Sequence, residues 1–272
     1  MVSSWTLDDI PWDRFDRGKL DPDVVRIVKA ASLVEYNGAA YGHHLCRIFH
    51  DDPDFQRAAR RWGDEEIQHG RALARWAALA DPSYDFELAF DRFRAGYRVD
   101  FDSDASRRGS RSGEMIARCM VEVGTSSYYS ALRDGVGEPV LKEICRNIAA
   151  DEIRHYRLFY NNLTRYLERE RIGFLQRLRV AFGRIAETED DELAYAYYAA
   201  NETAGPYDRR RYSRAYARRA LALYQEHHVR HMTAMAFKAV GLAPRSWIAR
   251  AASHLAWRAV RYGTTSLARV AA

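Results

Sequence analysis

Two copies of one metal-binding pattern occur in this chain, and each combines a lone glutamate with a Glu-x-x-His motif about thirty residues later. Within each motif the glutamate and the histidine are three residues apart, so they stand on one face of a helix. A carboxylate and an imidazole placed in this way can bind the same ion. The two copies supply six predicted ligands for two iron ions: Glu35, Glu66 and His69, and Glu122, Glu152 and His155.

The residues around both motifs indicate that the ligands point toward a core. A single Glu-x-x-His is common on solvated helix faces. Here, apolar side chains repeat at helical spacing around both motifs, namely Trp62, Leu73 and Trp76 in the first copy and Ile144, Ile148 and Phe159 in the second. Carboxylates on such stripes are costly to bury unless they are paired or bind a metal. The sequence therefore predicts the ligand set of a ferritin-like di-iron carboxylate bundle.

Glycines accompany the predicted ligands at Gly38, Gly70 and Gly124. They either leave space for an extended substrate or let two helices approach closely. The sequence alone keeps both interpretations open.

Helix-start and helix-stop signals place the ligands in an all-α fold. Asp21-Pro22 and Asp52-Pro53 each put a capping acid before a proline at the first helical position, and signals for β-strands are missing. Long helices are expected at 22–50, 53–80, 113–134 and about 139–169, with a short helix near 84–97 and a polar crossing loop over 102–113. We predict an N-terminal extension (1–21), a ferritin-like di-iron four-helix bundle (22–170) and a C-terminal helical extension packed on the bundle (171–272).

Composition narrows the class of protein. The 272 residues are 47% hydrophobic and carry a formal net charge of +5, which suits one large helical domain, and no nucleic-acid-binding motif accompanies the charge. The three cysteines include no Cys-x-x-Cys pair, which excludes a rubredoxin-type iron centre and favours a reducing compartment. The chain shows neither a signal-like start nor an apolar run of 18 residues. We therefore expect a cytoplasmic protein that is neither secreted nor membrane-spanning.

The C-terminal third contains two basic amphipathic segments and a histidine cluster. The apolar residues of the two segments are Phe174, Leu175, Leu178, Phe182 and Ile185, and Trp247, Ile248, Leu255 and Val260. We expect both segments to pack against the bundle, and peripheral contact with a membrane is the alternative. His227 and His231, with His228 between them, have a spacing that could bind metal, but no partner is evident elsewhere, so surface histidines are expected.

The segments Trp62–Gly70 and Ile144–His155 resemble the two metal motifs of the soluble acyl-acyl carrier protein desaturases, and the likeness includes positions beside the ligands. The resemblance covers the predicted bundle. It implies that Trp62 lies on the electron path and that Asp151 orients an iron-ligating histidine. It also implies that Thr125 sits beside the oxygen site.

The ligand set and the resemblance together predict an O2-dependent di-iron oxidoreductase that abstracts hydrogen from an aliphatic acyl chain, as a desaturase does. A ferredoxin-like electron donor is expected, because no flavin, nicotinamide or iron-sulfur motif supplies electrons internally. An acyl carrier protein and a second copy of the chain, in a homodimer, are the other expected partners. The alternatives are a hydroxylase or oxidase of another lipid or small molecule, and a ferroxidase or peroxide-scavenging protein like ferritin or rubrerythrin. A deep apolar tunnel ending at the irons would favour the oxygenase.

Overall fold

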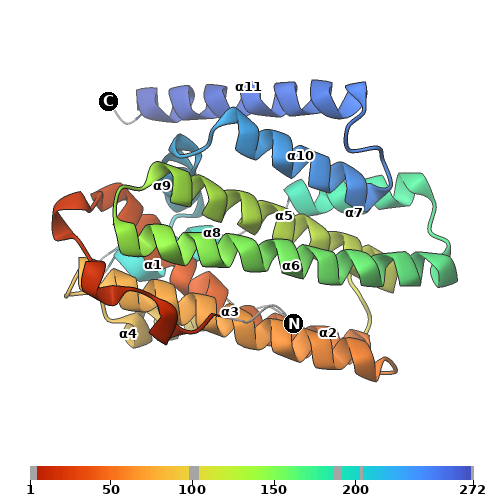
Figure 1. The fold of residues 1–272 in the computed structure, drawn as a ribbon, viewed down its shortest axis with the longest axis horizontal. Helices are drawn as coiled ribbons and strands as arrows, with labels where there is room; N and C mark the ends of the chain where they lie inside the picture. Colours follow the sequence, from red (N-terminus) through yellow and green to blue (C-terminus); the bar gives the residue numbers. More distant parts are fainter. Residues whose placement is uncertain (1–4, 98–103, 187–190, 203–204, 271–272) are drawn as a thin grey trace.

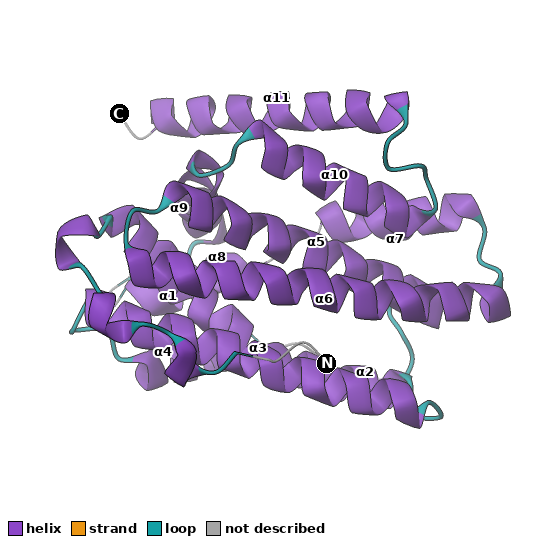
Figure 2. Cartoon of the chain, viewed as in Figure 1, coloured by secondary structure: helices purple, strands orange, loops and turns teal. Residues whose placement is uncertain are grey.

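The fold is all-helical in a computed structural model that describes residues 5–97, 104–186, 191–202 and 205–270 (Figure 1). Figure 2 shows helices and loops in these segments, and no strand occurs among them. The helices that carry the predicted ligands are α1 (Pro22–Tyr36), α3 (Pro53–Ala80), α5 (Arg111–Gly135) and α6 (Pro139–Glu170), together with α2 (Gly38–Ile48) and the short α4 (Phe86–Gly96). The predicted fold class is confirmed at the level of all-α structure.

Side-chain caps begin the long helices where the sequence predicts them. Asp21, Asp52 and Glu138 each accept a hydrogen bond from a backbone N–H in the first turn, and a proline follows each of them. These caps satisfy donors that have no partner within the helix. In the polar segment expected as a crossing loop, residues 102 and 103 lie outside the described residues, and α5 begins at Arg111.

The single helix expected over 22–50 is wrong, because the chain breaks at Asn37 between α1 and α2. Asn37 and Gly38 are both weak helix formers. Gly38 is also held against α3, where an added Cβ would lie 2.5 Å from the Cβ of Glu66. The break therefore sets the start of α2 directly against a predicted ligand.

Two apolar clusters lie along the long helices. One cluster includes Ile27, Leu33, Trp76, Leu132 and Ile144, and the other includes Leu45, Phe55, Trp62, Met115 and Phe159. Along α1–α2 and α6 the chain passes from the first cluster to the second, at Glu35 and Glu152, whereas α3 and α5 pass in the opposite direction at Glu66 and Glu122. α1 packs against α3, and α5 packs against α6. The two helices of each pair are therefore antiparallel, and the four glutamates lie at one level between the clusters.

The C-terminal helices cover these pairs from outside. They are α7 (Phe174–Ala186), α8 (Asp191–Asn201), α9 (Arg209–Ala222), α10 (Glu226–Val240) and α11 (Trp247–Val270). α7 and α10 pack on α5, α8 and α9 pack on α1, and α11 contacts only the outer helices α9 and α10 among the principal packing partners of the described chain (Figure 1). None of the helices in the described part of the chain has the length and apolar character needed to cross a bilayer.

The glycines beside the predicted ligands have two different surroundings. A Cβ on Gly70 would lie 2.6 Å from the backbone nitrogen of Tyr36, so this glycine, like Gly38, lets two helices approach closely. A Cβ on Gly124 would have no atom within 4 Å. Close helix packing therefore explains Gly38 and Gly70, and only Gly124 leaves open space.

These surroundings predict opposite effects of the same substitution. Gly70→Ala should lower the free energy of unfolding by about 1–3 kcal/mol, because the new methyl group must displace the backbone of α1. Gly124→Ala, in a helix with free space, should raise it by up to about 1 kcal/mol through helix propensity. Urea unfolding followed by circular dichroism measures both, and equal effects would contradict the close approach at Gly70.

Candidate metal centre

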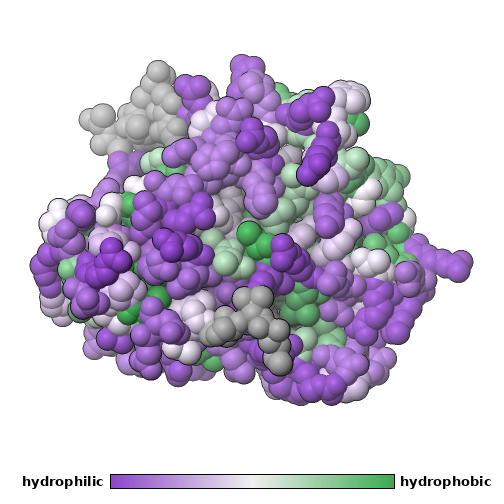
Figure 3. All heavy atoms as spheres, viewed as in Figure 1, coloured by the Kyte–Doolittle hydropathy of each residue, from purple (hydrophilic) through white to green (hydrophobic). Residues whose placement is uncertain are grey.

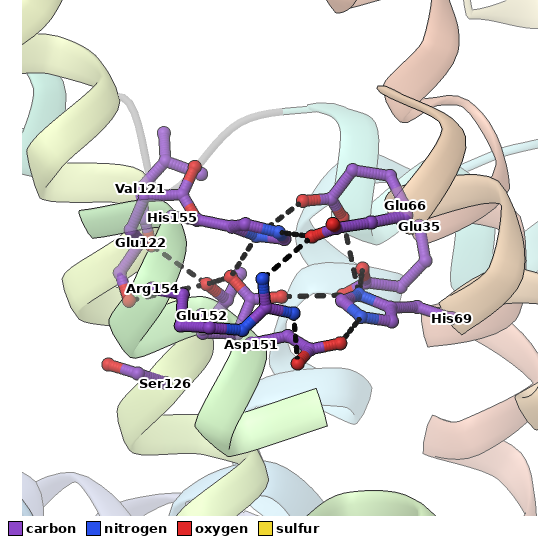
Figure 4. A network of polar contacts seen from close by, with 12 residues as sticks. Glu35, Glu66, His69, Val121, Glu122, Ser126, Asp151, Glu152, Arg154 and His155 are labelled. Atoms are coloured by element: carbon purple, nitrogen blue, oxygen red, sulfur yellow. Dashed lines mark hydrogen bonds and ion pairs between the residues drawn. The ribbon is translucent and has the colours of Figure 1, made fainter. Parts of the chain in front are cut away.

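All six predicted ligands converge in the interior (Figure 4). Glu35 comes from the last turn of α1, and the other three helices contribute the remaining five: Glu66, His69, Glu122, Glu152 and His155. Each of the six residues is buried, with at most 6% of its surface exposed. The structure thus brings together every residue of the predicted ligand set.

The ligand atoms form two groups of four that share Glu66 and Glu152. The first group is completed by Glu35 and His69, and the second by Glu122 and His155. His69 Nδ1 lies 3.4 Å from Glu152 Oε1, and His155 Nδ1 lies 3.2 Å from Glu66 Oε1. Two ligands bound at about 2.0–2.2 Å to one ion are about 3–3.5 Å apart. The spacing suits one ion in each group, with Glu66 and Glu152 between the two ions.

Most of these atoms have no hydrogen-bond partner although they are buried. The unpartnered atoms are Glu35 Oε2, both carboxylate oxygens of Glu122, Glu152 Oε1, and Nδ1 of His69 and of His155. An unsatisfied buried polar atom costs about 1–3 kcal/mol, and an unpaired charge costs more. Two divalent cations would bind these atoms and balance four carboxylate charges, so the residues fit a dinuclear metal centre.

Two further carboxylates orient the histidines. Asp151 Oδ2 lies 3.0 Å from Nε2 of His69, and Glu65 Oε2 lies 2.7 Å from Nε2 of His155. Because a carboxylate accepts the hydrogen bond, each Nε2 carries the proton, and the Nδ1 lone pair faces the other ligands. The structure places Asp151 beside a ligand histidine, as its predicted role requires.

The motif spacing predicts no role for Glu65, although its position in the sequence could have indicated one. Glu65 immediately precedes Glu66, just as Asp151 immediately precedes Glu152. Each motif therefore supplies the carboxylate that orients the histidine of the other motif. Arg154 donates to Asp151 and lies 3.4 Å from Glu65, so one guanidinium joins the two carboxylates.

Two tryptophans flank the two histidines. Trp5, which is half-buried, stacks on His69 with 6.0 Å between ring centroids and donates a hydrogen bond from Nε1 to Asp151 at 2.8 Å. Trp62 is buried and packs edge-on against His155 at 6.3 Å. No motif points to Trp5, because it lies in the N-terminal extension outside any helical pattern. The proposed electron path through Trp62 stays a prediction, and the tryptophan that contacts Asp151 is Trp5.

Two hydroxyl groups donate to ligand carboxylates. Thr125 Oγ1 lies 2.6 Å from Glu152 Oε2 and 3.3 Å from the Val121 carbonyl of its own helix. Tyr129, which the ligand pattern does not single out, donates to Glu35 Oε1 at 2.6 Å. The hydroxyl of Thr125 therefore contacts the centre itself, in addition to its helix backbone.

Burial and the neighbouring ligands together shift the pKa values of the carboxylates in opposite directions. Burial, followed by repulsion from a neighbouring carboxylate, raises the pKa of Glu35 and of Glu122 well above the usual range. Burial also opposes ionisation of Glu152, but the adjacent imidazoles of His155 and His69 hold its pKa well below the usual value. The pKa values of both histidines rise despite burial, because carboxylates surround them. Protons thus occupy the ligand set until a metal displaces them.

A cavity of about 70 Å³ adjoins the carboxylates beside Thr125. The rest of its lining is Gly38 together with apolar and charged side chains: Val34, Tyr41, Trp62, Arg118, Val121, Arg184 and Glu192. Sites for organic ligands usually measure about 300–1,000 Å³. Within the described residues, the cavity offers room for a molecule such as O2 beside the ligands and is not a deep apolar tunnel.

His227 and His231 of α10 are exposed, as expected, whereas His228 is buried and an acidic partner, Asp134, lies beside the cluster. Asp134 lies 3.0 Å from His228 Nε2 and 3.3 Å from His227 Nε2, whereas His231 is outside this group. His228 Nδ1 accepts the backbone N–H of Gln225, which leaves the proton on Nε2 facing Asp134. A protonated nitrogen cannot bind a metal, so the contact is a helix cap joined to a hydrogen bond with Asp134.

Comparison with known proteins identified no matching family model and no matching curated protein. The resemblance to desaturases therefore rests on the motif residues, and the metal centre rests on the geometry of its side chains.

The unsatisfied ligand atoms predict that metal stabilises the fold. Fe2+ added without oxygen should raise the melting temperature and bind at two ions per chain, because ligand at 100 times its Kd adds about 2.7 kcal/mol to the folded state. Glu152→Gln should abolish most of this shift, since Glu152 belongs to both groups of ligands. Glu168→Gln, on the exposed face of the same helix, should behave like the parent. Calorimetry with elemental analysis tests this, and one ion or none per chain would contradict a dinuclear centre.

The contact between Asp151 and His69 predicts a separate effect on reactivity. Asp151→Asn should weaken metal binding by no more than about 10- to 100-fold, because it perturbs only the orientation of His69. Reaction of the reduced, metal-loaded variant with O2 should be slower than that of the parent. An unchanged rate in stopped-flow measurements would show that Asp151 serves only its ion pair with Arg154.

Proposed function

We propose that the protein is an O2-dependent di-iron oxidoreductase whose helices α1–α2, α3, α5 and α6 form a ferritin-like four-helix bundle. In such bundles two helices each give one glutamate and the other two each give a Glu-x-x-His motif. The observation that carries the proposal is the pair of four-ligand groups sharing Glu66 and Glu152. Carboxylates with a few imidazoles suit iron that changes valence.

An iron pair bound here would supply the electrons that reduce O2. The chain's own residues orient the ligand histidines and position the protons that this reaction needs. Asp151 and Glu65 fix the proton of each histidine on Nε2. Thr125 lines the cavity and keeps its hydroxyl 2.6 Å from Glu152, where it can deliver a proton to the cavity. The surrounding apolar clusters keep bulk water away from the ligands.

Electrons are proposed to come from a ferredoxin-like partner. The sequence has no flavin, nicotinamide or iron-sulfur motif. Trp5 supports a route for electrons from the protein surface to the ligands, since it is half-buried and contacts both Asp151 and His69. A donor that docks over the N-terminal segment would lie next to this chain of contacts.

The desaturase resemblance supports an acyl chain on acyl carrier protein as the substrate. The cavity supports a second candidate, an iron-handling enzyme that oxidises Fe2+ or reduces peroxide without an organic substrate. An acyl chain needs side chains such as Tyr41, Arg118 and Arg184 to move aside, because the cavity measures only about 70 Å³. Oxidation of iron needs no such movement. The two candidates share one metal centre and differ in what enters it.

One experiment separates these candidates. Iron-loaded, reduced protein is mixed with O2, with and without a saturated acyl chain on acyl carrier protein, and the products are identified by mass spectrometry. An unsaturated or hydroxylated acyl product supports the oxygenase. Repeated oxidation of added Fe2+, with the acyl chain unchanged, supports the iron-handling enzyme. Oxidation no faster than that of free Fe2+ would contradict both.

Thr125 gives a sharper prediction within the proposed reaction. Thr125→Val should keep the iron content but slow the reaction with O2 by about 100-fold or more, because it removes a positioned proton donor. Thr125→Ser, which keeps the hydroxyl, should restore most of the rate. Ser126→Ala is the control, since within the described chain the Ser126 hydroxyl forms its hydrogen bond with the Val123 carbonyl of its own helix. Parental rates in Thr125→Val would remove this residue from the mechanism.

A further inference from the structure

Exposed hydrophobic side chains are concentrated on α7 and α11. Of the nine large hydrophobic side chains that are exposed in the described part of the chain, eight lie on these two helices. They are Phe174, Leu175, Phe182 and Ile185 on α7, and Trp247, Ile248, Leu255 and Tyr262 on α11. Leu175 is 79% exposed and Trp247 is 71% exposed, so the side chains stand out from the protein. α7 packs on α5 as expected, with Leu178 against the second apolar cluster, but the four side chains of α7 named above stay exposed. Within the described part of the chain, α11 packs on α9 and α10 and not on the bundle.

α7 lies beside the end of α10, next to the turn that leads to α11. Arg177 of α7 lies against Gly241, in the turn that leads to α11, where an added Cβ would be 2.6 Å from Arg177 Nη1. Figure 3 shows hydrophobic surface at the edge where α7 and the beginning of α11 lie. We call the eight exposed side chains of α7 and α11 the amphipathic surface.

The charge of this region is of one sign. The segments 171–186 and 227–272 contain eleven arginines and lysines and no aspartate or glutamate. Since the whole chain has a net charge of +5, the rest of the chain has a net charge of −6. Exposed arginines such as Arg179, Arg250 and Arg258 accompany the apolar side chains on the same helices. The positive charge of the protein is thus concentrated around the amphipathic surface.

We propose that the amphipathic surface docks on an anionic lipid bilayer. Helices with arginine on one side and Phe, Leu or Trp on the other lie in the interface of a membrane, where the apolar side chains enter the acyl boundary. Long arginine side chains reach the phosphate groups while their stems stay in contact with apolar atoms. Exposed arginines and exposed apolar side chains occur together on α7 and on α11, which carry eight of the nine large hydrophobic side chains exposed in the described part of the chain.

Charge favours lipid over a second copy of the chain. A symmetric dimer through this surface would place two sets of basic residues against each other without acidic residues to pair with them, and like charges repel. An anionic bilayer has the opposite charge and accepts protruding side chains without a matching groove. The surface also lies close to the metal centre, because Arg184 on the inner side of α7 lines the cavity, whereas Phe182 and Ile185 point outward.

Vesicle sedimentation with the full chain tests the proposal. The protein should bind vesicles of phosphatidylcholine mixed with phosphatidylglycerol, bind phosphatidylcholine alone much more weakly, and dissociate as salt is added. Leu175→Ser combined with Phe182→Ser should weaken binding about tenfold or more, because two apolar side chains no longer leave water. Leu88→Ser, at an exposed leucine on α4, is the matched control and should bind like the parent.

A second variant tests the charge without changing any apolar residue. Arg179→Gln, Arg250→Gln and Arg258→Gln together should weaken binding to the anionic vesicles by about 100-fold, since each basic residue near the surface contributes about 1 kcal/mol. Arg61→Gln, on the exposed side of α3, should have no effect. Absence of vesicle binding, or equal binding by all variants, would overturn the proposal. Self-association without vesicle binding, lost in the double serine variant, would instead assign the surface to a dimer.

Discussion

Four carboxylates buried at one level of the helices are the constraint on which the rest of the structure depends. Removing each charge from water costs several kcal/mol unless a counter-charge accompanies it. The protein moderates this cost by raising the pKa of Glu35 and Glu122 and by placing His69 and His155 among the carboxylates. The many ligand atoms that still lack partners are best explained by two cations.

The surrounding elements serve this centre in layers. Asp151, Glu65 and Arg154 hold the histidines from outside, and the glycine at position 38 lets α2 approach the ligand Glu66. α7 closes the cavity with Arg184, and its opposite face carries part of the amphipathic surface. A helix that contacts the cavity on one side and solvent on the other is well placed to connect the proposed membrane docking with access to the cavity.

Local patterns in the sequence predict much of this architecture. The ligands follow from the Glu-x-x-His spacing, and the starts of α1, α3 and α6 follow from an acid before a proline, because both signals act within one helix turn. Features that depend on contacts between distant segments are not predictable in this way. Trp5 meets Asp151 across 146 residues, and the break at Asn37 reflects close packing on α3. The arrangement of the C-terminal helices leaves four apolar side chains of α7 exposed.

Anomalous diffraction at the iron absorption edge, from crystals of protein reconstituted without oxygen, is the most direct test of the dinuclear centre. Two iron peaks about 3.5–4 Å apart are expected, with Glu66 and Glu152 between them and one histidine Nδ1 beside each. A single peak, no peak, or iron bound elsewhere, for example beside His227, would contradict the dinuclear centre.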